Sequence, residues 1–232
     1  YKIDAVPHII CGGFTKEETE NALIDLNFLG IDNVLALRGD PIKTEPGFVA
    51  EENGHAYAGE LVNQIVGLNK GDYMDEDLQN ATPTNFCIGV AGYPEKHFEA
   101  PNLKTDMKFL KQKIELGAEY IVTQLFYDNQ KFKDFVNLCR SEGITVPIIP
   151  GIKPISTKKQ LLTLPKFFHI DLPDELVDAV ESCKDNEEVK QVGINWAIQQ
   201  SKDLIAFGVP CIHYYTMGKS LATREVVKAV FS

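Results

Sequence analysis

The sequence has few of the features that mark disulfide-rich, membrane-bound or metal-binding proteins. Its cysteines are odd in number, widely spaced and without a CxxC pair: Cys11, Cys87, Cys139, Cys183 and Cys211. This usage indicates reduced thiols and argues against a zinc site or a disulfide framework. No apolar stretch reaches membrane-spanning length, and no signal peptide precedes the first predicted strand. We therefore expect a cytoplasmic protein with no bound metal and no membrane partner.

Basic charge is also scarce. The 232 residues include 23 Lys and Arg against 33 Asp and Glu, which gives a formal net charge of −10. Nucleic acids and anionic membranes favour a basic surface, so neither is expected as the main partner. No GxGxxG follows a predicted strand and no GxxxxGK[ST] occurs, so both common nucleotide fingerprints are absent. A local phosphate site, made by one cation and a few backbone N–H groups, remains compatible with this charge.

A repeated pattern is present instead. Short apolar runs end in polar or glycine residues, and an amphipathic helical stretch follows. The runs cover residues 5–13, 33–39, 86–93, 120–128, 147–155 and 211–218. Met107, Leu110 and Ile114 have helical spacing before Gly117, a residue that commonly ends helices. A long helix is predicted over 185–207, and an additional helix near 174–183.

Strands that alternate with helices and are apolar on both faces predict a parallel α/β sheet, either doubly wound or closed into a barrel. We favour a (β/α)8 TIM barrel, because barrels carry their chemistry at the C-terminal ends of all strands, whereas doubly wound sheets concentrate it at one switch point. The polar residues that support this choice are His8, Asp40, Tyr93, Gln124, Lys153 and Thr216. Six units are visible, so we expect one barrel domain over 1–232 that lacks about its first two βα units. The polar loop 42–55 is a predicted lid or rim.

Residues 38–40, Arg-Gly-Asp, follow the apolar run that begins at Asn33. Burying unpaired charge costs several kcal/mol, so a partner is expected at this strand end. In a strand, Arg38 and Asp40 project to the same side, and Gly39 would let a flat group approach the backbone. An arginine suits phosphate. A local Arg–Asp pair that ends the strand is an equal alternative.

Further candidates follow the next strand. Tyr93 and His97 in "GYPEKHFEA" would stack on and hydrogen-bond a nucleotide base, or they belong to a capped strand-to-helix turn. Asp106 and Lys113 lie seven residues apart and therefore share a helix face. They would bind ribose hydroxyls and a phosphate, although a solvated charged face explains them equally well.

Two polar residues stand in apolar strands. The Gln124 amide needs hydrogen-bond partners, either a substrate amide or core groups. Lys153 would be a Schiff-base lysine as in barrel aldolases, or, as the more favoured alternative, an exposed lysine at a strand end.

Taken in order, "LALRGDP", "GYPEKHFEA", "GAEYIVTQLFYD" and "PIIPGIKPI" make the chain resemble the methylenetetrahydrofolate reductase family, from about "PHIIC" to "HYYTMGKSLATREVV". The resemblance implies a (β/α)8 barrel that binds FAD at its C-terminal face. It also implies ping-pong reduction of 5,10-methylenetetrahydrofolate to 5-methyltetrahydrofolate with NADH or NADPH. Folate and a nicotinamide nucleotide would be the partners, and bacterial relatives suggest a homo-oligomer by analogy.

Position by position, the resemblance implies roles for individual residues. Asp40, near the flavin N1 region, and Gln124, which contacts folate and nicotinamide, would be catalytic. Gln160 and Lys219 would contact folate, and Lys219 replaces a common arginine, so a point charge replaces a bidentate grip. The implied FAD contacts are His8, Arg38, Gly39, Asp40, Tyr57, Ala58, Tyr93, His97, Asp106 and Lys113.

The resemblance also brings one departure. The family acid, a glutamate that ends the first strand, has no counterpart here, so we expect the chain as given to bind flavin weakly and to be inactive in folate reduction. Two other functions stay open. One is a barrel lyase that uses Lys153 as a Schiff base, and the other is a non-catalytic folate- or flavin-binding fragment.

Overall fold

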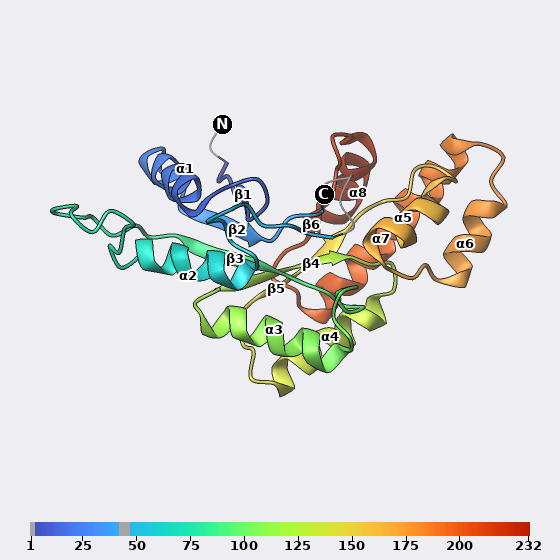
Figure 1. Ribbon diagram of the computed structural model, residues 1–232. Coiled ribbons are helices and arrows are strands. Elements are labelled where there is room, and N and C mark those ends of the chain that lie inside the picture. The colour runs from blue at the N-terminus through green and yellow to red at the C-terminus, as the bar shows by residue number, and fades with distance from the viewer. Residues whose placement is uncertain (1–2, 42–46) are drawn as a thin grey trace. The chain divides into compact units, whose positions relative to one another are not determined.

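A computed structural model describes residues 3–41 and 47–232, in which helices follow parallel strands along the chain (Figure 1). The strands are β1 (His8–Ile10), β2 (Asn33–Leu37), β3 (Cys87–Gly92), β4 (Tyr120–Leu125), β5 (Ile148–Ile152) and β6 (His213–Tyr214). The helices are α1 (Lys16–Phe28), α2 (Ala58–Leu68), α3 (Leu103–Glu115), α4 (Asn129–Ser141), α5 (Gln160–Phe168), α6 (Asp174–Glu181), α7 (Asn186–Phe207) and α8 (Leu221–Phe231).

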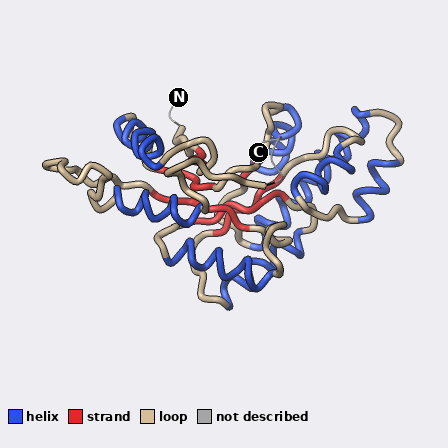
Figure 2. The backbone as a smooth tube through the Cα atoms, in the orientation of Figure 1, coloured by secondary structure: helices blue, strands red, loops and turns tan. Residues whose placement is uncertain are grey.

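The strands make one sheet in the order β1-β2-β3-β4-β5-β6, drawn in red in Figure 2. Parallel register pairs His8 with Leu35 between β1 and β2, and Gly151 with His213 between β5 and β6. A doubly wound sheet would reverse its strand order at a switch point, whereas a (β/α)8 barrel keeps sequence order throughout. The order therefore confirms the predicted barrel class, with six of the eight barrel strands in the described residues.

The chain divides into two compact units, and each is described here by itself. Unit 1 comprises residues 1–91 and 108–121, and unit 2 comprises residues 92–107 and 122–232. That residues 1–232 form a single domain stays a prediction.

The core of unit 1 lies between β2 and α2. Val34 and Ala36 are fully buried, and so are Leu61 and Ile65 of α2, which are four residues apart and share one helix face. The predicted burial of this strand is therefore confirmed.

A tyrosine ring fixes the backbone of β3 in the same unit. The Tyr120 hydroxyl donates a hydrogen bond to the Val34 carbonyl at 2.9 Å. Its ring lies where a Cβ at Gly89 would stand. A glycine is therefore required at this point of the strand.

The core of unit 2 gathers around β4, β5 and α7. Leu125, Ile155, Leu176 and Val189 are among its buried members. The backbone of Ile155 lies so close to Gly193 of α7 that a Cβ there would overlap the Ile155 carbonyl. The closeness of α7 to the chain just after β5 thus depends on one glycine.

The predicted helices agree with the structure. Helix α3 covers the Met107–Ile114 repeat, and Gly117 has a φ of 121°, typical of glycine beyond a helix end. Helix α7 begins after Asp185, whose carboxylate accepts from the Glu187 and Glu188 N–H groups. It ends at Gly208 in the left-handed conformation. The additional helix near 174–183 is α6.

Candidate functional site

The end of β2 carries the first predicted cluster of unit 1. Strand β2 ends at Leu37, and Gly39 follows with a φ of 90°. The prediction that Arg38 and Asp40 lie in a strand and project to the same side is therefore wrong, because the chain leaves the extended conformation between them. A Cβ at Gly39 would meet only ordinary contacts, the nearest at 3.6 Å, so the backbone angle rather than crowding requires glycine.

Side-chain exposure separates the two charges at this turn. Arg38 is half-buried, and its guanidinium carbon lies 5.1 Å from the centre of the Phe48 ring, within cation–π range. Asp40 is exposed. The predicted loop 42–55 lies partly outside the described residues, because 42–46 are not included, and its remainder contributes Phe48 to this contact.

His8 occupies a different place from the one predicted. It is the first residue of β1 and is exposed, whereas the sequence interpretation placed it among residues that end strands. The apolar run 5–13 is longer than the strand, which occupies only its centre, and that length misplaced the histidine.

Tyr57 and Ala58 lie at the N-terminus of α2. The Glu60 carboxylate accepts hydrogen bonds from the Ala56 and Tyr57 N–H groups, at 2.7 and 3.4 Å, and so satisfies backbone donors at the helix start. Tyr57 is 64% exposed. Its ring is therefore open to solvent at a helix N-terminus, where backbone N–H groups favour anions.

A cavity of 640 Å³ lies beside α2 in unit 1, and its lining includes His55, Glu60, Gln64 and Leu116. His55 is buried, and one of its ring nitrogens, Nε2, lies 2.6 Å from Gln64 Oε1. The other, Nδ1, has no hydrogen-bond partner among residues 3–41 and 47–232 and lies 4.0 Å from the Glu60 carboxylate. The sequence analysis did not select His55, because a lone histidine in a polar loop carries no spacing signal.

The turn after β3 carries the first predicted binding residues of unit 2. The rings of Tyr93 and His97 are edge to face, with centroids 4.6 Å apart. The His97 N–H donates to Asp106 Oδ2 at 2.9 Å, so Asp106 holds the turn from the first helical turn of α3. The predicted strand-to-helix turn is therefore present, and binding of a base by the two rings stays a prediction.

Lys113 carries the second charge predicted on α3. Within unit 1 its ammonium donates to the Ala91 carbonyl near the end of β3, at 2.8 Å. Asp106 and Lys113 therefore both bind main-chain groups, which a simple solvated charged face would not explain.

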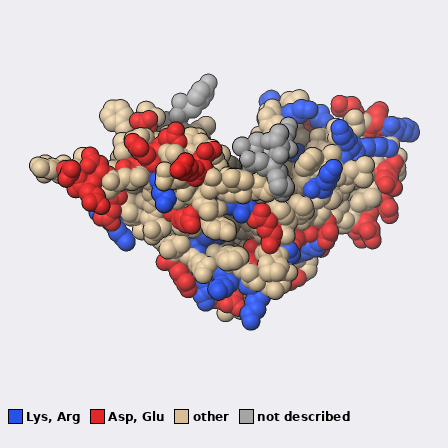
Figure 3. Space-filling view, viewed as in Figure 1, with Lys and Arg blue, Asp and Glu red and all other residues tan. Residues whose placement is uncertain are grey.

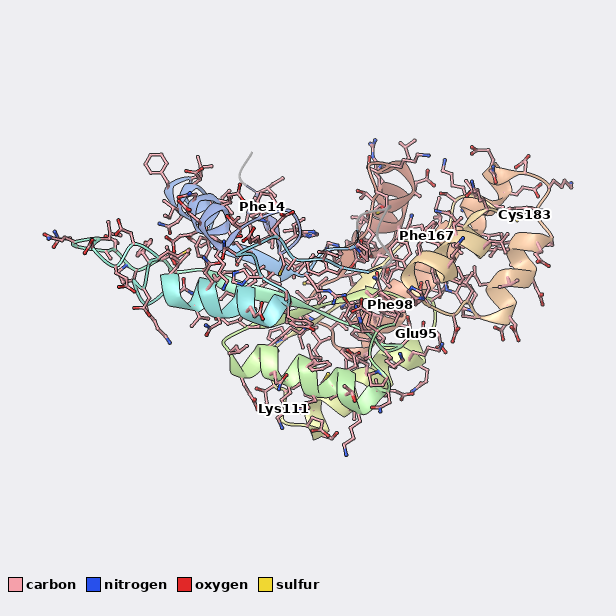
Figure 4. The ribbon with its side chains drawn as sticks, in the orientation of Figure 1. Phe14, Glu95, Phe98, Lys111, Phe167 and Cys183 are labelled. Carbon is pink, nitrogen blue, oxygen red and sulfur yellow. The ribbon has the colours of Figure 1, made fainter. Side chains whose placement is uncertain are left out.

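Glu95, labelled with Phe98 in Figure 4, is a member of this turn that the sequence analysis missed. Its Oε2 accepts from Lys131 Nζ at 2.8 Å and from the Asp171 N–H at 2.9 Å, and Lys131 also pairs with Asp171 at 2.6 Å. Burial raises the pKa of Glu95, against the effect of the Lys131 bond. The Lys131 hydrogen bond lowers the pKa of Asp171. Only its position between Tyr93 and His97 in the sequence could have singled out Glu95.

Three residues at or after the ends of β4, β5 and β6 complete the predictions in unit 2. Gln124 is half-buried in β4, and its side-chain carbonyl accepts from the Leu125 N–H at 2.9 Å. Gln160 begins α5 and accepts from the Ser156 N–H at 2.7 Å and the Thr157 N–H at 3.1 Å. Lys219 is exposed in the turn after β6.

The environment of Lys153 differs from the favoured sequence interpretation, an exposed lysine at a strand end. Lys153 follows β5 directly and is only 9% exposed, so it is not an exposed lysine at a strand end. Burial, with a smaller contribution from the charge of Lys219, lowers the pKa of Lys153. The flanking prolines made the position look like surface, although Pro154 is itself buried.

Residues 3–41 and 47–232 contain neither a cluster of metal ligands nor a membrane-spanning helix. This part of the chain has no group of three or more His, Cys, Asp or Glu side chains arranged to hold a metal ion. None of its helices combines the length and apolar character required to cross a bilayer. All five cysteines are free thiols, and burial raises the pKa of Cys11 and Cys139 to about 12.

Comparison with known proteins decides the family. The family model described as methylenetetrahydrofolate reductase matches residues 1–230. The chain belongs to the methylenetetrahydrofolate reductase family. The relatives of this family include methylenetetrahydrofolate reductase (NADH) 1 of Arabidopsis thaliana, 42% identical over 225 residues that make up 93% of this chain and 36% of that protein. The 5,10-methylenetetrahydrofolate reductase of Buchnera aphidicola is 33% identical over 97% of this chain and 70% of its own length.

The chain thus spans about a third of the length of its plant relatives. Among solved structures, an uncharacterised protein from Clostridium thermocellum that binds two copies of 5-methyl-5,6,7,8-tetrahydrofolic acid aligns with 97% of this chain and 94% of its own. Its TM-score is 0.44 and its identity 16%, a distant similarity.

Proposed function

We propose that this chain carries the catalytic part of an FAD-dependent methylenetetrahydrofolate reductase. The enzyme would reduce 5,10-methylenetetrahydrofolate to 5-methyltetrahydrofolate with NADH or NADPH. The observation that carries the proposal is the match of the family model over residues 1–230. FAD, when bound, supplies a hydride acceptor for the nicotinamide and a hydride donor for the folate.

The residue types at the predicted positions fit a flavin dinucleotide. Arg38 supplies a permanently charged guanidinium, and Lys113 an ammonium, for the two phosphates. Tyr93 and His97 supply neighbouring rings, with centroids 4.6 Å apart, for an adenine. The positive φ of Gly39 favours glycine, so no side chain stands in the turn where the isoalloxazine would approach.

Asp40 is proposed to tune the hydride transfer to folate. It is exposed directly after the glycine turn, so its carboxylate is available to a ligand. A negative charge at this place would stabilise a cationic form of the folate. Gln124 would hold folate and nicotinamide in turn, because an amide both donates and accepts hydrogen bonds. Gln160 and Lys219 would contact the folate.

Purification with FAD tests this function directly. We expect the full-length protein that contains this chain to retain a flavin absorbance band, to lose that band on anaerobic addition of NADH or NADPH, and to regain it with methylenetetrahydrofolate. A protein that shows no flavin band after FAD addition would refute the proposal. A band that is bleached and never restored by folate would refute the assignment of the second substrate.

Substitution of Asp40 tests the charge argument. We predict that Asp40→Asn slows the folate half-reaction about tenfold or more, while the nicotinamide half-reaction changes less. Stopped-flow measurement of each half-reaction separates the two effects. Asp25→Asn, which neutralises an exposed carboxylate of α1 in the same unit, should change neither. Equal slowing of both half-reactions by Asp40→Asn would contradict the argument.

The burial of Lys153 and its lowered pKa favour one second candidate, the Schiff-base lyase, because a less protonated lysine is a better nucleophile. Borohydride trapping of carbonyl compounds, with mass analysis of the peptide that contains residue 153, tests it. Covalent labelling of Lys153 would support the lyase, and the absence of any labelling of the wild type would eliminate it.

A further inference from the structure

Lys153 is held at a defined place between two paired strands. Strands β5 and β6 are in parallel register with Ile152 opposite Tyr214, and the Tyr215 N–H donates to the Ile152 carbonyl at 2.9 Å. The carbonyl of Lys153 itself accepts from the Tyr127 hydroxyl at 2.8 Å. Tyr127 is 2% exposed, so the backbone that carries Lys153 is anchored from within the core of unit 2.

The neighbouring strand delivers a second cation. The turn after β6 closes with a hydrogen bond from the Lys219 N–H to the Thr216 carbonyl at 2.8 Å. Because β5 and β6 are adjacent and parallel, both lysines follow the C-terminal ends of paired strands. The charge of Lys219 acts on Lys153 and disfavours its protonated form.

No carboxylate compensates Lys153 in the part of the chain that the structure describes. Lys131 of the same unit shows the contrast, because it pairs with both Glu95 and Asp171 within 2.8 Å. An ammonium that loses water without gaining a counterion is destabilising, and a second ammonium nearby increases that cost. A bound anion would offset this cost, because it would supply the missing counter-charge.

We propose that Lys153 and Lys219 form a binding site for an oxyanion of the substrate, either a carboxylate of the folate or a phosphate of the nicotinamide nucleotide. This inference rests on the proposed function and adds Lys153 as a specificity-determining residue. A bound oxyanion would lie near both ammonium groups and supply the counter-charge that the chain omits. Binding would also cause proton uptake in those protein molecules in which Lys153 is neutral, since a bound anion favours the protonated, charged form of the lysine.

Affinity measurements on the full FAD-loaded protein test the proposal. The variants are Lys153→Met, Lys153→Arg and, as a matched control, Lys166→Met, which removes an exposed lysine of α5 in the same unit. Three probes separate the sources of the anion: folate with its glutamate, the corresponding pteroic acid amide, which has no carboxylate, and NADH. We expect Lys153→Met to weaken one glutamate- or phosphate-bearing probe about tenfold or more, with the affinity for the amide unchanged.

Calorimetry in two buffers of different ionisation enthalpy supplies a readout that a purely structural lysine would not alter. At alkaline pH, wild-type protein should take up protons on binding the affected probe, and Lys153→Met should not. Lys153→Arg should retain part of the affinity without proton uptake, because arginine remains charged. Lys166→Met should behave as wild type.

Each outcome is decisive. A loss for folate alone assigns the site to the glutamate carboxylates, and a loss for NADH alone assigns it to the nucleotide phosphates. Unchanged affinities and proton uptake in Lys153→Met, in a protein that binds FAD, folate and NADH, overturn the inference and leave the proposed function intact. A protein that binds none of these ligands overturns both. Borohydride labelling of Lys153 would also overturn the anion site.

Discussion

Lys131 and Lys153 of unit 2 differ in what surrounds each ammonium. Lys131 lies between two carboxylates, and Lys153 is buried beside another lysine. Replacing a buried charge that lacks a partner with an apolar side chain of similar length should remove a desolvation cost. Lys153 is therefore expected to lower the stability of the folded chain while serving a ligand.

We predict that Lys153→Met raises the free energy of unfolding by about 1–2 kcal/mol near neutral pH. The sign of its pH dependence follows from the lowered pKa of Lys153. Between that pKa and the unfolded value of about 10.4, the unfolded chain binds more protons, so wild-type stability rises with pH. The difference between the two proteins should thus shrink as pH approaches that unfolded value.

Urea unfolding of wild type and variant over this pH range measures the difference. Lys166→Met serves as the control and should show no pH-dependent difference from wild type. A Lys153→Met protein less stable than wild type at every pH would show that the lysine has a structural role.

At the same scale, sequence alone identified residue types better than their surroundings. It selected Tyr93 and His97, which lie together in the structure, and Arg38, which contacts Phe48. It misjudged Lys153, because adjacent prolines suggest a surface while the neighbouring strand buries the side chain. Glu95 was missed because its partners are distant in the sequence. Lys131 is 36 residues away, and Asp171, which donates through its main-chain N–H, is 76 residues away.

Among the elements, α7 depends most visibly on a single residue. Gly193 lets the helix approach the Ile155 backbone, and a Cβ there would overlap the carbonyl. Gly67 of α2 offers a matched contrast, because the nearest contact of its Cβ would be an ordinary 3.6 Å, to the Asp72 carbonyl.

We predict that Gly193→Ala lowers the free energy of unfolding by about 3 kcal/mol or more, because the helix must shift away from Ile155. Gly67→Ala should leave stability unchanged or raise it by up to about 1 kcal/mol, through the better helix propensity of alanine. Urea unfolding of both variants tests this. Equal effects would indicate that intrinsic propensity, rather than the close approach, governs position 193.

Elements were predicted well where periodicity or a stop signal marked them. The Met107–Ile114 repeat located α3, and Gly208 located the end of α7. Strand lengths were overestimated, since the run 211–218 contains a strand of only His213–Tyr214. An apolar run indicates which residues are buried, and buried residues extend beyond those that pair in the sheet. The run is therefore longer than the strand.

At the scale of the whole molecule, the single tryptophan distinguishes the two units. Trp196 lies in unit 2, and its indole N–H donates to the Tyr127 carbonyl at 3.0 Å. Its fluorescence therefore reports the unfolding of unit 2, whereas far-ultraviolet circular dichroism reports both units. The proposed FAD contacts occur in both, for example Arg38 in unit 1 and His97 in unit 2.

We predict that FAD at a hundredfold excess over its Kd stabilises the protein by about 2.7 kcal/mol in both signals, because a ligand that binds only the folded state shifts unfolding by mass action. Parallel fluorescence and dichroism melts with and without FAD make the comparison. A shift in dichroism with an unchanged tryptophan transition would restrict flavin contacts to unit 1. The Asp25→Asn variant should show the wild-type shift in both signals.

The distribution of acidic surface charge affects how anionic ligands approach the protein from solution. Acidic side chains gather on the face over α1, α2 and the loop after α2, where Asp72, Asp75, Glu76 and Asp77 follow closely (Figure 3). A surface of this sign repels nucleotides and folates at long range, and the effect weakens with salt. Half-buried or buried cations near strand ends, such as Arg38, Lys113 and Lys153, are therefore expected to influence where anionic ligands bind.

The contact between Tyr120 and Gly89 has a consequence for protein engineering. In a saturation library across β3, position 89 should return only glycine, since any larger residue must displace a ring whose hydroxyl is tethered to the Val34 carbonyl. Recovery of other residues there would come only with a second change at Tyr120. The two codons should accordingly be randomised together.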